Sequence, residues 1–212
     1  MPPPSKRAGT AMRAQKTKER ILAAALKIFQ DEGLHTPSAV DVASALSISP
    51  GHLYYHFKGK PELIAALYEG HRQEMAMILN GIVGADPKLE ELWTHVQIVL
   101  EEIQDMRFLY RDLHAACAVS ETLDKGMRGI VAGLRRALHG FLEKLTKAGT
   151  LPPKEGLPAM LAEQMVQAIL TRMNVQEIDA PNEAPREQVA RAALFVMTFV
   201  AAHVENAMPA KR

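Results

Sequence analysis

The chain has 212 residues, of which 48% are apolar, and 25 Lys and Arg stand against 24 Asp and Glu. This length and composition suit a globular protein with a sizeable core and exclude a disordered chain. A single cysteine, Cys117, excludes an intramolecular disulfide and a Cys-rich zinc module. The basic start is followed by no apolar run of the secretory kind, so a cytoplasmic protein is expected.

The net charge of +1 hides an asymmetry along the chain. Residues 1–60 hold nine Lys and Arg against four Asp and Glu, a net of +5, whereas residues 61–212 hold sixteen against twenty, a net of −4. A basic end can meet phosphates, but a solvated tail has the same composition. Charge alone leaves both interpretations open.

Apolar residues recur at helical spacing and no alternating run predicts a strand, so the chain is predicted to be all-α. Residues 1–15, rich in Pro, Gly, Ala and basic residues, are expected to form a disordered basic arm. A helix with one buried stripe follows from Thr17, and Gly33 is placed to end it. The stripe residues, three and four apart, are Leu22, Ala25, Leu26 and Phe29.

Two short helices come next. The first begins near Ser38, and Asp41 stands three residues on, as a capping pair requires. The second begins with Ser49 as N-cap and Pro50 at the first helical position. Two helices joined by so short a turn predict a helix-turn-helix, whose second helix lies in the major groove of DNA.

The second short helix carries an unusual set of side chains, in the run SPGHLYYHFKGK. Leu53 and Phe57, four residues apart, are expected to face inward. The residues left largely outward are Gly51, His52, Tyr54, Tyr55 and His56. Tyr and His offer a hydrogen-bonding tip that reaches a phosphate oxygen or a base edge, although either tyrosine could instead pack against the first helix.

The segment from Thr17 to Gly70, with SPGHLYYHFKGKPEL at its most specific part, resembles the DNA-binding domain of the TetR family of bacterial transcriptional regulators. The resemblance implies a homodimer in which each subunit presents one recognition helix to half of a roughly palindromic operator. It implies that Ser38 and Ser49 begin helices beside the DNA backbone and that Gly51 permits close approach. By position, base edges would face His52 and Tyr54, and phosphates would be held by Tyr55, His56 and Lys60.

Two positions depart from the family pattern. Ser47 stands where members usually have Gly, at a position that tends toward positive φ, so a strained turn is expected. His52 occupies a position that commonly holds a smaller residue and is expected to shape the operator preference. Ahead of the first helix, a basic arm could enter the minor groove or act as a solubilising tail; its residues are Lys6, Arg7, Arg13, Lys16, Lys18 and Arg20.

The rest of the chain is predicted to form a helical regulatory and dimerisation domain over residues 71–207, after a DNA-binding domain over residues 16–70. Residues 71–80 continue the helix that Pro61 begins and link the two domains. Five further helices are expected, separated by Pro- and Gly-containing breaks, at residues 88–105, 107–119, 121–149, 156–175 and 185–207.

The last helix is apolar nearly all round, because no charge lies between Arg191 and Glu205. This run is too short to span a bilayer, which takes about 20 residues, so no membrane contact is expected. An apolar cylinder in a soluble protein must be covered on two sides. The expected cover is a second copy, with a homodimer interface formed by the helices at about 157–175 and 186–205.

The middle of the chain holds bulky, adaptable and cationic residues that could bind an unidentified small-molecule effector. The tentative pocket residues are Trp93, Phe108, Tyr110, Arg111, His114, Met127 and Met173. The same residues equally suit a plain core. His114 and Cys117 are too few ligands for a zinc site, and enzyme motifs are absent, so no metal, cofactor or catalytic residue is expected.

These features are interpreted as a homodimeric, small-molecule-responsive repressor that binds a double-stranded DNA operator and is not an enzyme. One alternative is a DNA-binding regulator without an effector. Another is a helical lipid or acyl-group carrier for which the basic end is incidental.

Overall fold

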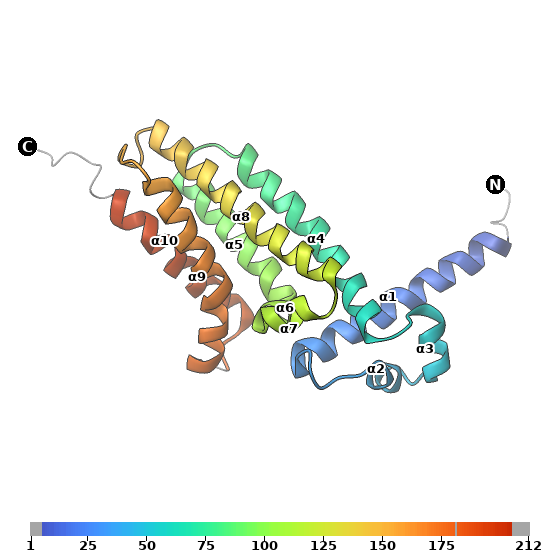
Figure 1. Cartoon of the computed structure of the whole chain (residues 1–212). Helices are drawn as coiled ribbons and strands as arrows, with labels where there is room; N and C mark the ends of the chain where they lie inside the picture. The colour runs from blue at the N-terminus through green and yellow to red at the C-terminus, as the bar shows by residue number, and fades with distance from the viewer. Residues whose placement is uncertain (1–5, 181, 205–212) are drawn as a thin grey trace, which may run out of the picture.

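The computed structural model describes residues 6–180 and 182–204, and within these ranges every regular element is a helix, as the sequence predicts (Figure 1). The helices in chain order are α1 (Lys6–Glu32), α2 (Ala39–Ala45), α3 (Pro50–His56), α4 (Lys60–Gly84), α5 (Leu89–Asp105), α6 (Arg107–Arg111), α7 (Leu113–Ala118), α8 (Glu121–Lys147), α9 (Leu157–Asp179) and α10 (Pro185–Val204).

The N-terminal unit is built on one face of α1. Ile21, Ala25 and Phe29 are buried at intervals of four, and the predicted stripe residues Leu22 and Leu26 flank them half-buried. Gly33 follows α1 with a positive φ of 77°, and its amide donates to the Phe29 carbonyl. These contacts place α1 across α2 and against the start of α4.

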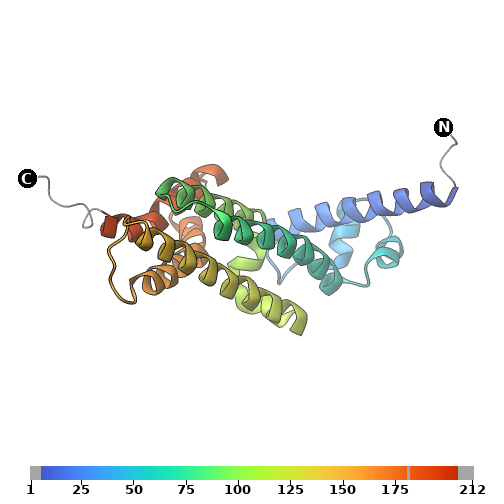
Figure 2. The ribbon, with the colours of Figure 1, turned by 90° about the horizontal axis from the view of Figure 1, so that it is seen from above.

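The first helix begins earlier than expected. Residues 6–15 are helical in the structure, whereas composition predicts a disordered arm over 1–15; residues 1–5 lie outside the described residues. After Pro4 the segment consists mainly of Ala, Lys, Arg, Met and Gln, which favour helix, and the single Gly9 does not interrupt it. Figure 2 shows this half of α1 running outward past α3.

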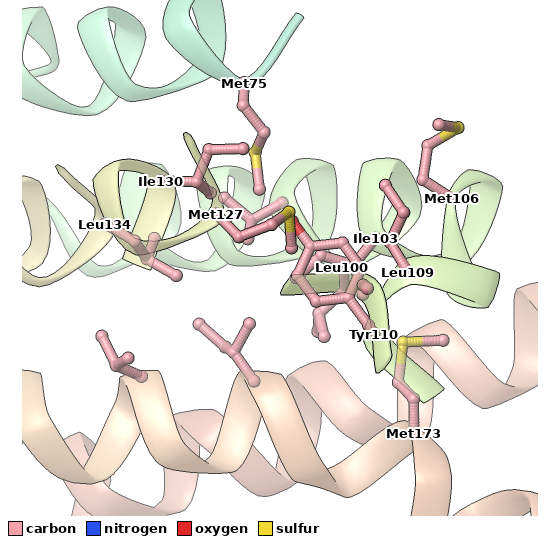
Figure 3. Close-up of a cluster of buried hydrophobic side chains, with 14 of the residues drawn as sticks. Met75, Leu100, Ile103, Met106, Leu109, Tyr110, Met127, Ile130, Leu134 and Met173 are labelled. Atoms are coloured by element: carbon pink, nitrogen blue, oxygen red, sulfur yellow. The ribbon is translucent and has the colours of Figure 1, made fainter. Parts of the chain in front are cut away.

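The second domain packs α4, α5, α8, α9 and α10 side by side (Figures 1 and 2). Its centre is a cluster of buried side chains from several helices, in which aliphatic and methionine side chains surround the ring of Tyr110 (Figure 3). The cluster includes Met75, Leu100, Ile103, Met106, Leu109, Met127, Ile130, Leu134 and Met173. Four of the tentative pocket residues therefore belong to the core: Phe108, Tyr110, Met127 and Met173.

The single helix predicted over 107–119 is divided in the structure. Asp112 has φ −138° and ψ 81°, and its carboxylate accepts a hydrogen bond of 2.9 Å from the Ala115 amide, which begins α7. An Asp that caps a new helix competes with continuation of the old one. The remaining predicted helices agree with α5, α8, α9 and α10 apart from their ends, and residues 205–207 lie outside the described residues.

Helix α10 is 20 residues long and apolar enough, by length and composition alone, to cross a bilayer, and 33% of an 18-residue stretch of it is buried. Its buried side packs on α9 and α5. Its other side leaves the large apolar side chains of Leu194 and Phe195 exposed.

Two glycines of α8 let α4 pass very close to it. A Cβ added at Gly126 would lie 1.9 Å from the Tyr68 hydroxyl oxygen, and one at Gly133 would lie 2.9 Å from Leu79 Cδ1. No side chain fits at the first position without moving Tyr68. A Cβ added at Gly129, between them, has nothing within 4 Å.

Gly126→Ala should therefore lower the free energy of unfolding by about 1–3 kcal/mol, because the methyl group overpacks the α4–α8 contact. Gly129→Ala is the matched control and should raise it by up to about 1 kcal/mol, since Ala favours helix over Gly. Urea unfolding followed by circular dichroism measures both changes. Equal stabilisation by the two substitutions would contradict the close approach of Tyr68 to α8.

Candidate nucleic-acid interface

Helix α2 begins with a reciprocal cap. The Ser38 hydroxyl oxygen accepts from the Asp41 amide at 3.3 Å, and the Asp41 carboxylate accepts from the Ser38 amide and hydroxyl, each at 2.7 Å. The Ser38 hydroxyl and amide donors lower the pKa of Asp41. The predicted capping pair is thus confirmed, even though Asp is shorter than the Glu usual at this position.

The turn into α3 contains the expected backbone strain. Ser47 has φ +54°, the only positive φ outside glycine among the described residues. Directly after it, the Ile48 amide donates to the Ala43 carbonyl at 3.0 Å, which returns the chain toward α2. The turn therefore holds α3 at a defined angle to α2, at the cost of a conformation that glycine adopts more easily.

The start and the inner face of α3 are as predicted. The Ser49 hydroxyl accepts from the His52 amide at 3.2 Å, and Pro50 occupies the first helical position. Leu53 is 0% exposed and Phe57 is 4% exposed, so these two side chains fix the helix to the domain core. The rest of the helix is left to face outward.

The outer face of α3 presents aromatic rings to solvent. Tyr55 is 78% exposed and Tyr54 is 41% exposed. The His56 ring meets the rings of His52 and Tyr55 edge-on, at centroid distances of 5.3 and 5.1 Å. A Cβ added at Gly51 meets nothing within 4 Å, which leaves the helix backbone there open to close approach.

His56 is the least exposed of the outward-facing side chains. Burial, followed by the nearby His52 and Lys18, lowers the pKa of His56 and favours its neutral form. The Lys18 ammonium also lies 6.0 Å from the centroid of the Phe57 ring, so α1 passes the end of α3. A neutral His56 can hydrogen-bond to a phosphate but adds no charge.

Lys60 has protein partners that the sequence did not predict. Its ammonium donates to the Leu34 carbonyl and, at 3.5 Å, to the His35 carbonyl, and burial lowers the Lys60 pKa. The lysine thereby ties the first turn of α4 to the loop after α1. Lys58, two residues earlier, is exposed, although it was not among the residues predicted to contact DNA.

The tentative pocket residues do not gather in one place. Phe108, Tyr110 and Met173 are buried in the core, and Arg111 lies half-buried on α6. Trp93 lines a hollow beside α10. They are scattered because bulky residue types suit core packing as well as pocket walls.

Of that set, His114 and Met127 share a hollow, which lies between α7 and α8 and measures about 530 Å³. Its lining residues are Leu113, His114, Cys117, Met127, Arg128, Val131 and Arg135. Both arginines are paired, Arg128 with Asp124 at 2.9 Å and Arg135 with Glu163 at 2.5 Å. The hollow therefore suits a mostly apolar molecule more than an anion.

A buried polar cluster joins three helices of the second domain. His71 Nδ1 lies 2.5 Å from a Glu102 carboxylate oxygen, and Nε2 lies 2.7 Å from the Tyr110 hydroxyl. Burial is the main cause that raises the pKa of Tyr110, and the Tyr110 carbonyl accepts from Asn174 of α9 at 3.1 Å. This cluster was not expected from the sequence, and the available signal was a histidine at core spacing on α4.

Two family profiles match the chain. The profile described as "Bacterial regulatory proteins, tetR family" matches residues 21–67, and the one described as "Bacterial transcriptional repressor" matches residues 71–210.

Curated relatives match over the N-terminal unit. The regulator UidR of Escherichia coli K12 is 46% identical over 54 residues, which are 26% of this chain and 28% of UidR. AcrR of Shigella flexneri is 35% identical over 60 residues, 28% of each chain. The chain thus matches well under two thirds of these relatives.

Solved structures match over nearly the whole chain. A TetR-family regulator from Marinobacter aquaeolei VT8 has a TM-score of 0.80 at 22% identity, over 91% of this chain and 99% of that one. The SmeT–triclosan complex has a TM-score of 0.65 at 18% identity, over 92% and 96%. These likenesses concern the fold.

Ser47→Gly should stabilise the protein by up to about 1 kcal/mol, because glycine adopts a positive φ without strain. Part of this gain is offset by the greater conformational entropy of glycine in the unfolded chain. Ser44→Gly, inside α2 and exposed, is the control and should destabilise it by roughly 0.5 kcal/mol. Urea midpoints measure both. A lower midpoint for Ser47→Gly would show that the turn carries no strain.

Proposed function

The chain belongs to the tetR family of bacterial regulatory proteins, and from this premise we propose that it is a homodimeric repressor that leaves its operator when a small molecule enters the second domain. DNA binding and regulation of transcription follow from the family itself. We propose in addition which residues contact the DNA, that the chain forms a homodimer, that it responds to a small-molecule effector and that it acts in the cytoplasm.

The outward rings of α3 carry the DNA contacts in this proposal. Leu53 and Phe57 anchor the helix, and the exposed His52 and Tyr54 then face base edges in the major groove. Tyr55 and the exposed Lys58 meet phosphates, together with the helix starts at Ser38 and Ser49. Lys60 acts mainly by holding the loop that precedes α2.

The exposed apolar side chains of α9 and α10 support the dimer. Ile178 is 82% exposed and Leu194 is 61% exposed, values unusual for such residues unless something covers them. Met160, Val175 and Phe195 are exposed on the same two helices. A second copy placed about a two-fold axis covers both helices with identical surfaces.

The hollow between α7 and α8 is the proposed effector site. Its walls are largely apolar and its arginines are neutralised, which favours a small apolar molecule with few polar groups. One protein of the same fold, SmeT, forms a complex with triclosan. Effector binding would favour a dimer whose recognition helices are wrongly spaced for the operator.

A second candidate is a regulator of the same family without an effector. The observation that favours it is the close-packed centre of the second domain, where Tyr110, Met127 and Met173 fill space in a core (Figure 3).

Lys58→Ala should weaken binding to every DNA sequence alike and reduce the slope of log affinity against log salt by roughly 0.9, because it removes one phosphate contact.

His52→Ala should instead change the ranking of operator variants, because base contacts carry sequence information. Both effects are measured by binding to the DNA upstream of the protein's own gene across a salt series. Lys154→Ala, in the loop before α9, is the control. An unchanged ranking for His52→Ala would remove His52 from the base-reading residues.

Ile178→Asp should raise the dimer dissociation constant by at least roughly 100-fold, since each subunit loses a buried apolar side chain and gains a charge. Met77→Asp, at an exposed apolar position of α4, is the control and should leave the dimer intact. Analytical ultracentrifugation over a concentration series measures the change. A monomeric wild-type chain would end the dimer proposal.

A further inference from the structure

The segment 107–118, made of α6 and α7, lies between the N-terminal unit and the proposed effector hollow. On one side, the Phe108 ring packs against the Phe29 ring of α1, with 5.6 Å between the ring centroids, and Arg107 donates to the Gln30 carbonyl at 3.3 Å. On the other side, His114 and Cys117 line the hollow. Any molecule in the hollow therefore touches a segment that also contacts α1.

Asp112 lies at the joint between α6 and α7, and its carboxylate has two partners. One oxygen accepts from the Ala115 amide at 2.9 Å and so begins α7. The other lies 3.2 Å from His35 Nε2, in the loop after α1. The Ala115 amide, and then His35, lower the pKa of Asp112. The start of α7 and the loop of the DNA-binding unit are thus held by the same carboxylate.

The loop on the far side of this contact leads directly to the DNA-binding elements. The His35 carbonyl accepts from the Lys60 ammonium at the start of α4. Three residues after His35, Ser38 caps α2. Movement at His35 therefore reaches the start of α2 through three residues of chain and the start of α4 through one hydrogen bond.

We propose that Asp112 is a positioning residue that couples occupancy of the α7–α8 hollow to the placement of the helix-turn-helix, through its contact with His35. A mostly apolar molecule in the hollow displaces the six-residue α7, and because Asp112 caps that helix, the carboxylate leaves His35. The loop after α1 then loses its contact with α7 and keeps its contact with Lys60 of α4, which carries any shift of the loop to that helix. This inference rests on the proposed function and gives its effector site a route to the DNA.

The loss of operator affinity expected from breaking the Asp112–His35 contact is modest in each subunit. Both side chains are exposed, His35 at 77% and Asp112 at 47%, so their contact changes an equilibrium by up to about fivefold. In a dimer the two copies act together, and breaking both pairs lowers operator affinity by up to about 25-fold, a range typical of coupling between sites.

The sole cysteine provides a test that needs no knowledge of the effector. Cys117 lines the hollow, and benzyl methanethiosulfonate places a benzyl group there: the thiolate attacks the thiosulfonate sulfur, a mixed disulfide forms, and methanesulfinate leaves. Burial raises the pKa of Cys117, so the reaction is run at alkaline pH and checked by mass spectrometry. Cys117→Ser, treated alike, controls for other effects of the reagent.

Operator affinity is then measured with and without the benzyl group in wild type, Asp112→Asn and His35→Gln. Asn retains the cap of α7 but lacks the carboxylate, so folding of that helix is preserved. Wild type should lose up to about 25-fold in affinity on modification. The two variants should begin weaker than wild type and change by less than about twofold, and the double variant should resemble either single one.

Equal losses of affinity on modification in wild type and both variants would overturn the role of Asp112, as would an unchanged affinity of modified wild type. His114→Cys in the Cys117→Ser background repeats the measurement from an exposed position of the same hollow. Failure of unmodified wild type to bind its operator would instead reject the proposed function on which the inference rests.

Discussion

The placement of the DNA-binding unit on the second domain depends on the last turn of α1. There the Phe29 ring, buried in the N-terminal core, also packs on Phe108 of α6. The neighbouring Gln30 side chain donates to the last carbonyls of α5, at Gln104 and Asp105, which the end of a helix leaves without partners. One apolar contact and one cap supplied from the other domain thus help to join the two units, whose buried side chains form one continuous core.

Signals confined to a few neighbouring residues allowed the DNA-binding unit to be predicted in detail. The caps at Ser38 and Ser49 depend on local backbone geometry, which short motifs specify well, whereas the positive φ at Ser47 was expected from the family resemblance. The inward positions of Leu53 and Phe57 follow from helical spacing. The same rules correctly located the long helices of the second domain, since each has a strong apolar pattern and a clear break after it.

Features that depend on distant parts of the chain were not predictable. Lys60 finds the carbonyls of Leu34 and His35 only after α4 has packed against α1, and His71 meets Glu102 and Tyr110 only in the assembled second domain. The tentative pocket residues are scattered for a related reason, because residue type indicates burial but not which neighbours surround a side chain. The helical start of α1 shows the opposite error: composition was given more weight than the helix propensity of the residues present.

Helix α4 belongs to both domains, and this gives it a mechanical property. It runs unbroken for 25 residues, a length of about 38 Å at 1.5 Å per residue, from the recognition helix to the far end of the second domain. At Tyr68 and at Leu79 it lies against a glycine of α8, where the two helices approach closely. A rigid rod held in this way transmits rotation rather than bending. A tilt of about 5° over that length displaces the end beside the DNA by about 3 Å, a large fraction of the spacing between adjacent base pairs.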